Sequence, residues 1–321
     1  MKAEESLSTL ASDVARGLSS TPKQLPPYLF YDEEGSRLYE QITELPEYYP
    51  TRTERAILER HATDIVSRVA SGSEAPLRVV ELGAGTATKT RLVLEAVVQR
   101  QGRCLFMPID VSRAALEEAE EHLARDLPSV DVRPFVGLHS EALQTIRALG
   151  PRRLVLFIGS SIGNFEDDEA LELLRGVRAA LAAGGALLLG TDLRKDPERL
   201  VPAYDDAAGV TAAFNRNVLT RINRELGGSF DPSAFEHVAL WNEQASRIEM
   251  HLESKEDQSV LIERLGLVVH LKQGERIHTE SSIKYDLARV DALLSAAGFE
   301  RETTYTDDED LFAVHLARAA G

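Results

Sequence analysis

Cysteine is almost absent from this chain, which has only Cys104 among its 321 residues. A single cysteine cannot form an internal disulfide, and its place in the apolar run C-L-F-M-P-I favours a buried hydrophobic side chain over a reactive thiol. The sequence also lacks any stretch of about 18 apolar residues, so we expect no membrane-spanning helix. The acidic start M-K-A-E-E is unlike a signal peptide, and we therefore expect a cytoplasmic protein.

Positive charge is also scarce, because 36 Lys and Arg residues stand against 52 Asp and Glu residues, giving a formal net charge of -16. A protein of that charge repels phosphate backbones and anionic lipids unless it concentrates a basic patch, and no such cluster stands out. We therefore expect a small-molecule substrate, and neither nucleic acid nor a membrane as partner. The eight histidines form no H-x-H or H-x-x-x-H pair, so no metal site is predicted.

Strand and helix patterns alternate through the middle of the chain. Strands are predicted at 77–81, 104–109, 130–136, 153–158 and 186–190, with helices such as 113–126 and 169–183 between them. This spacing predicts right-handed crossovers and a parallel, Rossmann-like α/β sheet. Residues 291–320 are predicted to add a helix and an antiparallel hairpin at the sheet edge.

The stretch from Leu77 to Thr90 reads L-R-V-V-E-L-G-A-G-T-A-T-K-T. It predicts a strand that ends near Glu81, a loop turned by Gly83 and Gly85, and a helix that begins near Thr90. Backbone N–H groups and a helix N-terminus would then form a cradle for a nucleotide-like ligand. Asp110 follows the next strand, where it can accept hydrogen bonds from ribose hydroxyls.

Two further segments interrupt the alternation. The first, 28–49, holds five of the eight tyrosines and is either a packing platform or a ligand-binding wall. The second, 194–284, is an insertion with helical and alternating patterns, expected over the carboxyl edge of the sheet. We predict that 1–55 and 194–284 form a substrate-binding domain, that 56–193 bind the cofactor, and that 285–321 close the sheet.

A competing motif follows the fourth strand, where G-S-S-I-G satisfies the G-x-S-x-G pattern of α/β-hydrolases with Ser161 as nucleophile. His237, His278 or His315 are possible bases. That alternative leaves the earlier glycine loop and Asp110 without a role.

Several strings carry a specific resemblance: F-Y-D at 30–32, L-P-E-Y-Y-P-T-R-T-E at 45–54, G-N at 163–164, G-T-D-L at 190–193 and F-N-R-N at 214–217. Together with the glycine loop, in which Thr88 replaces a third glycine, they resemble the L-histidine Nα-methyltransferases of ergothioneine biosynthesis. This resemblance implies a seven-stranded class I methyltransferase sheet, S-adenosylmethionine as cofactor, and three methyl transfers to the α-amino group of histidine, giving hercynine. A methyltransferase of the same fold acting on another amino acid, such as tryptophan, is the alternative.

The resemblance also implies which residues bind. From the family, cofactor contacts are expected at Gly83, Lys89 and Asp110; the strand-loop pattern adds Glu81 and Gly85, and the segment after the third strand adds Leu138 and His139. Contacts to histidine and its mono- and dimethylated forms are expected at Tyr31, Tyr48, Gly159, Asn164, Tyr204, Met250, Glu280 and Ser282, with Tyr31 and Asn164 closest to the chemistry. We expect a monomer.

Two details of this set refine the expectation. Glu280 and Ser282 alternate along a strand-like run, so an acid and a hydroxyl on one face can bind the imidazole ring. Relatives usually carry an acid and an aromatic residue after the third strand, whereas this chain has Gly137-Leu138-His139-Ser140. We therefore expect backbone groups or stacking on His139 to bind adenine.

Overall fold

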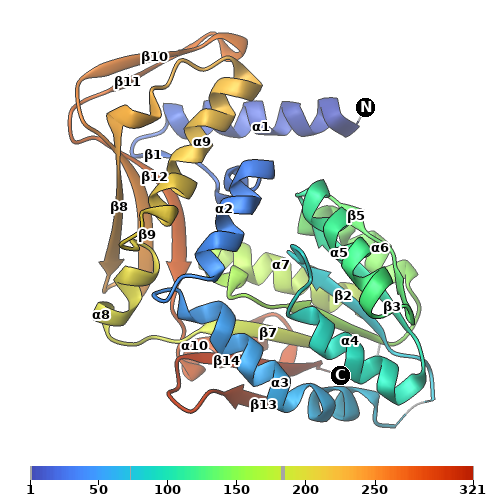
Figure 1. The fold of residues 1–321 in the computed structure, drawn as a ribbon. Coiled ribbons are helices and arrows are strands. Elements are labelled where there is room, and N and C mark those ends of the chain that lie inside the picture. Colours follow the sequence, from blue (N-terminus) through green and yellow to red (C-terminus); the bar gives the residue numbers. More distant parts are fainter. Residues whose placement is uncertain (1, 73, 182–184, 321) are drawn as a thin grey trace. The chain divides into compact units, whose positions relative to one another are not determined.

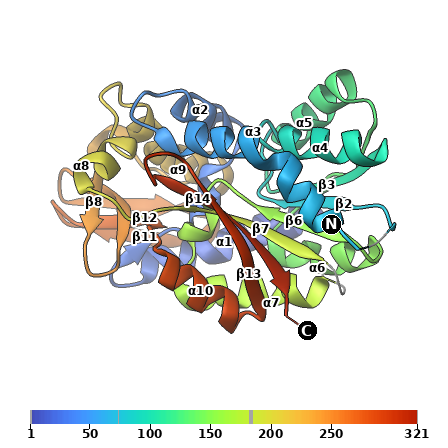
Figure 2. The same ribbon diagram turned by 90° about the horizontal axis from the view of Figure 1, so that it is seen from below.

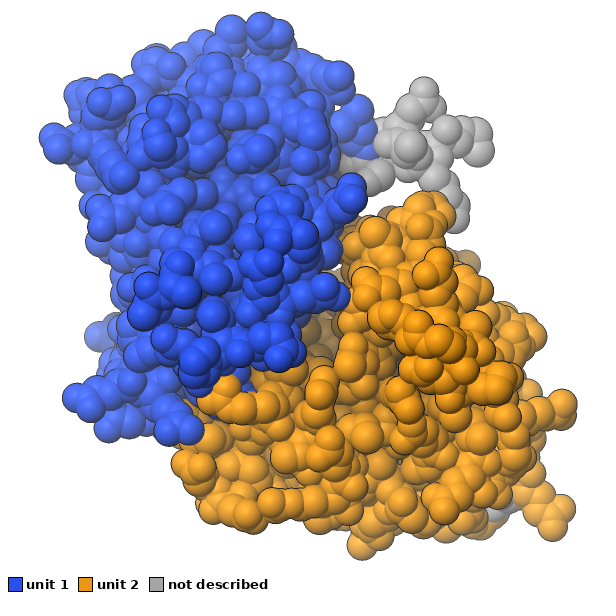
Figure 3. Space-filling model, in the orientation of Figure 1, with its two compact units in different colours: residues 1–49, 196–282 blue, residues 50–195, 283–321 orange. Residues whose placement is uncertain are grey.

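The computed structural model describes residues 2–72, 74–181 and 185–320, and divides the chain into two compact units (Figure 3). The smaller unit contains residues 1–49 and 196–282, and the larger contains 50–195 and 283–321. The N-terminal segment and the insertion thus share one unit. The unit boundaries differ by two to six residues from the positions 55, 193 and 284 expected from the sequence.

The larger unit is built on one sheet whose strands follow the order β13-β14-β7-β6-β2-β3-β4 (Figures 1 and 2). The short strand β5 pairs with the C-terminal end of β3. The strands are β2 (Arg78–Leu82), β3 (Cys104–Asp110), β4 (Val130–Val132), β5 (Phe135–Val136), β6 (Arg153–Phe157), β7 (Ala186–Asp192), β13 (Phe299–Thr306) and β14 (Phe312–Ala319). All neighbouring pairs are parallel except those that β14 makes with β7 and β13. The predicted seven-stranded methyltransferase sheet, with its closing hairpin, is confirmed.

Alternate strand residues point to opposite sides of this sheet, and both sides carry apolar side chains. Helices therefore cover both faces. Val79, Phe106 and Leu156 pack with α3 (Tyr49–Ala70), α4 (Thr90–Gln101) and α5 (Arg113–Asp126) on one face. Val80 and Met107 pack with α6 (His139–Ala148), α7 (Asp167–Ala180) and α10 (Leu287–Ala296) on the other. Strands buried on both faces explain the nearly continuous apolar runs of the sequence.

Two elements of the larger unit differ from the sequence prediction. The strand expected at 130–136 is broken into β4 and β5, because Pro134 in the gap lacks the N–H that a sheet ladder needs. The helix expected at 169–183 begins at Asp167 and ends at Ala180. The last two residues of the predicted helix, 182 and 183, lie outside the described residues.

The smaller unit contains the helices α1 (Lys2–Ser19), α2 (Glu33–Thr43), α8 (Pro197–Leu200) and α9 (Val210–Leu226). Short 3-10 turns are η1 (Pro27–Phe30), η3 (Val201–Ala203), η4 (Pro232–Ala234) and η5 (Glu263–Leu265). One sheet has the order β1-β12-β9-β8, from β1 (Lys23–Gln24), β8 (Phe235–Asn242), β9 (Arg247–Ser254) and β12 (Arg276–Ile283). The hairpin of β10 (Gln258–Ile262) and β11 (Leu267–Leu271) stands apart from it (Figure 1).

This hairpin lies in the part of the insertion where an alternating pattern was expected. The chain turns through η5, and Gly266 adopts a positive φ of 57° that lets the strand reverse. Strand β8 was not predicted.

Among the described residues, no helix is long and apolar enough to cross a membrane.

Candidate functional site

The glycine loop of the larger unit begins where β2 ends, at Leu82. Gly83 and Gly85 have positive φ angles of 69° and 51°, which a residue with a side chain adopts only under strain. The N–H groups of Gly83 and Ala84 donate to the Ile109 carbonyl at 2.8 and 3.0 Å, which ties the loop to β3. Helix α4 then starts at Thr90. The loop is therefore an open cradle of backbone at the carboxyl edge of two parallel strands.

Asp110 is the last residue of β3 and lies against this loop. Its carboxylate accepts the Gly85 N–H at 2.9 Å and the Ser112 N–H at 2.8 Å. Burial raises the pKa of Asp110, while hydrogen bonds from backbone N–H groups oppose that rise. The structure thus brings Asp110, Gly83 and Gly85 together at one sheet edge, as the sequence predicted for these neighbouring strand ends.

Glu81, predicted near the end of its strand and as a cofactor contact, is the penultimate residue of β2 and is buried. Its side chain is only 2% exposed, and the carboxyl group accepts a hydrogen bond from the Thr90 hydroxyl at 2.5 Å. Burial raises the pKa of Glu81 to about 8. Glu81 therefore joins β2 to the first residue of α4 beneath the loop.

The segment after β5 carries Leu138 and His139. The Leu138 N–H donates to the Glu141 carboxylate at 3.1 Å, so this backbone donor is engaged within its own helix turn. The His139 ring lies near Gly83, since a β-carbon added to Gly83 would be 3.6 Å from Nε2. The ring packs edge-on against Phe157, and burial lowers its pKa to about 4. A neutral imidazole beside the glycine loop offers an aromatic surface on which a nucleobase can stack.

Lys89, at the end of the loop, forms an ion pair with Glu54 of α3. The Glu54 side chain is fully buried, and both of its oxygens lie 2.9 Å from the Gly159 nitrogen, whose N–H they accept. One buried carboxylate thus contacts two residues predicted to bind ligands. Sequence reasoning did not select Glu54, although it closes the L-P-E-Y-Y-P-T-R-T-E string that carried the family resemblance.

The turn that follows β6 contains Gly159 and Asn164. Ser160 has a positive φ of 59°, and its hydroxyl accepts the backbone N–H of Asp192 at 2.8 Å. The chain then forms η2 (Ser161–Asn164), where a β-carbon on Gly163 would lie 2.8 Å from the Ile283 carbonyl oxygen. These constraints fix the path of the backbone that leads to Asn164, which is partly exposed at the end of the turn.

The same turn contradicts the hydrolase alternative. The Ser161 hydroxyl donates to the Ile158 carbonyl at 3.3 Å. His315 is hydrogen-bonded to Thr191 and Thr304, at 2.9 and 3.0 Å. The two remaining candidate bases are also engaged, His237 with Asn215 and the Tyr204 carbonyl, and His278 with Ser281. No hydrogen bond between Ser161 and a histidine occurs among the described residues.

The smaller unit gathers the predicted tyrosines into one aromatic cluster. Tyr31 packs edge-on against Tyr39 at 5.7 Å, Tyr39 against Tyr48 at 6.4 Å, and Tyr48 against Tyr204 at 6.3 Å between ring centroids. The Tyr204 hydroxyl lies 2.8 Å from the Ser282 hydroxyl. Burial raises the pKa of Tyr48 well above its ordinary value, so its phenol remains protonated.

Phe214 of α9 completes this cluster, with its ring 5.8 Å from Tyr31 and 6.1 Å from Tyr39. Neither Phe214 nor Tyr39 was predicted as a site residue. The aromatic density at 28–49 and the F-N-R-N string were the signals that could have selected them.

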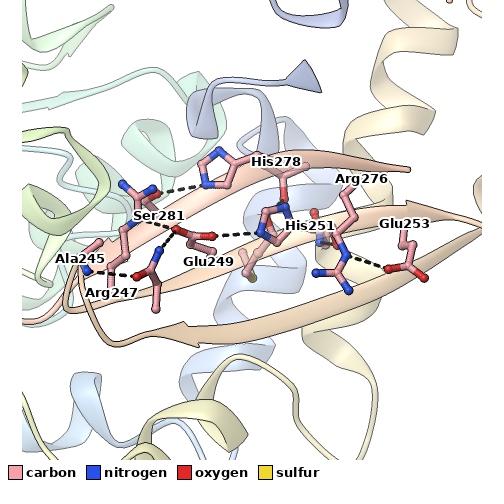
Figure 4. A network of polar contacts seen from close by, with 12 residues as sticks. Ala245, Arg247, Glu249, His251, Glu253, Arg276, His278 and Ser281 are labelled. Carbon is pink, nitrogen blue, oxygen red and sulfur yellow. Dashed lines mark hydrogen bonds and ion pairs between the residues drawn. The ribbon is translucent and has the colours of Figure 1, made fainter. Parts of the chain in front are cut away.

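Met250 lies in β9, where side chains alternate between two faces. Met250 is paired with Ala239 of β8, and the next pair on that face, His237 with Leu252, faces Asn215 of α9. The opposite face holds a polar network in which Glu249 joins Arg247 to His251, and the His251 ring packs on His278 at 5.2 Å (Figure 4). Met250 therefore points away from that network, towards α9.

Glu280 and Ser282 lie in the neighbouring strand β12, and their exposed fractions are 8% and 3%. His278 contacts Ser281 at 3.0 Å, a contact that regular alternation does not allow between residues three apart. Strand β12 therefore departs from regular alternation just where the predicted imidazole-binding pair begins.

Across the chain, the predicted residues form two groups. The larger unit holds Glu81, Gly83, Gly85, Lys89, Asp110, Leu138 and His139, together with Gly159 and Asn164. The smaller unit holds Tyr31, Tyr48, Tyr204, Met250, Glu280 and Ser282. Among the described residues, no group of three or more His, Cys, Asp or Glu side chains could hold a metal ion.

A parallel sheet of this order, closed by an antiparallel strand and carrying a glycine loop beside a strand-end acid, defines a class I methyltransferase fold. Residues 10–319 match a family profile described as histidine-specific methyltransferase, SAM-dependent. The chain belongs to this family, as the sequence resemblance predicted.

Individual relatives agree with the family. The chain is 44% identical over 317 residues to a histidine N-alpha-methyltransferase of Mycolicibacterium smegmatis, covering 99% of this chain and 97% of that protein. It is 44% identical over 308 residues to the enzyme of that name from Mycobacterium tuberculosis, covering 96% and 94%. It is 32% identical over 304 residues to ergothioneine biosynthesis protein 1 of Neurospora crassa, covering 92% of this chain but 33% of that longer protein.

Proposed function

We propose that this protein transfers methyl groups from S-adenosylmethionine to the α-amino nitrogen of L-histidine, three times in succession, to give hercynine for ergothioneine biosynthesis. The observation that carries the proposal is the match of nearly the whole chain to the histidine-specific family, together with a glycine loop and strand-end acid that fit the cofactor. The 44% identity to enzymes named histidine N-alpha-methyltransferase supports the same acceptor.

The larger unit is proposed to bind the cofactor. Gly83 and Gly85 allow the methionine part of S-adenosylmethionine to approach the backbone. Asp110 accepts hydrogen bonds from the ribose of the cofactor, and Lys89 attracts its carboxylate. The His139 ring is proposed to pack against adenine, because the Leu138 N–H already donates to Glu141. When bound, the sulfonium supplies an electrophilic methyl group.

The smaller unit is proposed to recognise histidine. Tyr204 and Ser282 are hydrogen-bonded to each other, which fixes the positions of two polar groups proposed to contact the substrate. Buried Glu280 can accept a hydrogen bond from the imidazole N–H, and the aromatic cluster around Tyr31 can hold an amine that becomes more apolar with each methyl group. Asn164 of the larger unit is proposed to orient the amine for in-line attack, since alignment supplies much of the acceleration of such displacements.

The proposal is tested by incubating the purified protein with S-adenosylmethionine and each of the twenty proteinogenic amino acids, then measuring the mass of the products. Trimethylated histidine is the expected product, and mono- and dimethylhistidine should also be consumed. Methylation of tryptophan or another amino acid, with histidine unchanged, would replace the proposed acceptor while keeping the reaction class.

Selectivity for the imidazole is tested with Glu280→Ala. Because the variant loses a hydrogen bond to a charged group, kcat/KM for histidine should fall by about 10-fold to 100-fold. The residual methylation of other amino acids should fall by less. Glu253→Ala, which removes an acid of the same sheet from the network in Figure 4, is the matched control. Unchanged preference for histidine in Glu280→Ala would show that Glu280 does not contribute to recognition of the imidazole ring.

A further inference from the structure

Glu54 is a buried acid of helix α3 that no sequence signal assigned to the site. Its side chain has an exposed fraction of 0%, yet it pairs with the ammonium of Lys89 and accepts the Gly159 N–H. Lys89 stands at the end of the glycine loop that follows β2, and Gly159 begins the turn that follows β6. One carboxylate therefore joins the carboxyl ends of two adjacent parallel strands.

The surrounding backbone leaves room for this carboxylate. A β-carbon on Gly190 of β7 would lie 2.2 Å from the Glu54 Oε1 atom, so only glycine at this position permits the observed contact. Gly159 has a positive φ of 80°, and a β-carbon there would approach the Lys89 Nζ to 3.4 Å. Gly190 thus leaves room for the Glu54 carboxylate, whereas Gly159 is constrained by its positive φ and not by crowding against the ion pair.

Removing the charge of Glu54 has a predictable physical effect. A buried ion pair depends on both partners, and loss of one leaves the other without compensation. A glutamine could still accept the Gly159 N–H through its carbonyl oxygen, but it could not neutralise the Lys89 ammonium. The substitution therefore separates the charge of Glu54 from its shape.

We propose that Glu54 is a positioning residue of the methyl-transfer reaction, which holds Lys89 towards the cofactor carboxylate and Gly159 in the turn that leads to Asn164. Glu54 acts through these two residues and contacts neither substrate. This inference rests on the proposed function, since it assigns Lys89 to the cofactor and Asn164 to histidine.

The test is a double-mutant cycle on cofactor affinity, with Glu54→Gln, Lys89→Met and the double variant titrated calorimetrically with S-adenosylhomocysteine. Glu54→Gln should weaken binding by about tenfold or more, Lys89→Met by a similar factor, and the double variant no further than Lys89→Met. Glu54→Asp keeps the charge and should recover part of the affinity. Glu59→Gln, on the exposed side of the same helix, is the control and should bind as the wild type does.

Steady-state kinetics complete the test. Glu54→Ala, which also removes the acceptor of the Gly159 N–H, should raise the KM for histidine through the turn at Gly159, whereas Glu54→Gln should leave that KM near the wild-type value. Wild-type affinity and turnover in Glu54→Gln, or factors that multiply fully in the double variant, would overturn the inference. A wild-type protein that binds S-adenosylhomocysteine but leaves histidine unmethylated would instead contradict the proposed function, and the calorimetric cycle would still decide the role of Glu54. If Glu54→Gln does not fold, Glu54→Asp is compared with Lys89→Met instead: the shortened carboxylate should weaken S-adenosylhomocysteine binding, but by less than Lys89→Met does, and wild-type affinity in Glu54→Asp would overturn the inference.

Discussion

Glu81 shows how burial changes the chemistry of a single residue. Its carboxyl group is enclosed between β2 and Thr90, and its pKa rises from 4.5 to about 8. Since the folded-state pKa is raised, the protonated form is the one that folding favours. The contribution to stability is fully present below 4.5 and is lost as the pH rises through about 8.

Glu81→Gln should therefore flatten the dependence of stability on pH. Between those two pKa values the wild type should lose up to about 1.4 kcal/mol of unfolding free energy per pH unit from this residue, and the variant should lose none of it. Urea unfolding across that range measures the difference. Glu95→Gln, which alters an exposed acid of α4, should keep the slope of the wild type; an equal slope in Glu81→Gln would mean that Glu81 is ionised in the folded protein.

At the scale of single residues, some site residues could be predicted from the sequence and others could not. Gly83, Gly85 and Asp110 could be predicted because each belongs to a local strand-loop-helix pattern with a known physical role. Glu54 could not, because its partners Lys89 and Gly159 lie 35 and 105 residues away along the chain. Phe214 joins the tyrosine cluster from a helix far from 28–49, so no local pattern links them.

Strand β14 contains a buried histidine whose pKa can be tested through protein stability. His315, fully buried in this strand, bridges Thr191 of β7 and Thr304 of β13. Burial lowers its pKa from 6.5 to about 4, so the neutral imidazole is the form that the three strands accommodate. Its contribution to stability is present above 6.5 and is lost as the pH falls through about 4.

His315→Gln should accordingly reduce acid destabilisation. Over that interval the wild type should lose up to about 1.4 kcal/mol per pH unit more than the variant, measured as the fall in unfolding free energy. His122→Gln is the control, because His122 is 45% exposed on α5. A His315→Gln variant that loses stability as steeply as the wild type would assign the acid sensitivity to other groups.

Elements with a strong period were predictable, and those shaped by a local interruption were not. The apolar runs at 77–81, 104–109 and 153–158 matched β2, β3 and β6 within a residue at each end. The run at 130–136 looked continuous, and the alternating pattern of the insertion did not show the turn between β10 and β11. Pro134 removed a ladder hydrogen bond from the first, and the positive φ at Gly266 turned the second into a hairpin.

At the scale of the whole molecule, the two units should respond to different ligands. In hydrogen exchange, S-adenosylhomocysteine should slow amides near 83–90, 110–112 and 137–141 of the larger unit, because bound ligand suppresses local opening. Added L-histidine should extend protection to the aromatic cluster and to β12 in the smaller unit.

L-Tryptophan added with S-adenosylhomocysteine is the control and should leave the smaller unit unchanged. Protection of 28–49 by S-adenosylhomocysteine alone would contradict the division of roles between the units. The sequence predicted one domain from 1–55 and 194–284, and the smaller unit of the structure joins 1–49 with 196–282 across 146 intervening residues, namely 50–195.

The place of β14 between β7 and β13 also orders events during translation. A ribosome that has added residue 311 has made every other strand of the larger sheet, yet β13 still has no strand beside it. Strand β13 and the exposed edge of β7 must wait for residues 312–319 before either can pair, and unpaired strand edges are where nascent chains associate wrongly. The larger sheet therefore cannot be completed until residues 312–319 have been made, long after the glycine loop.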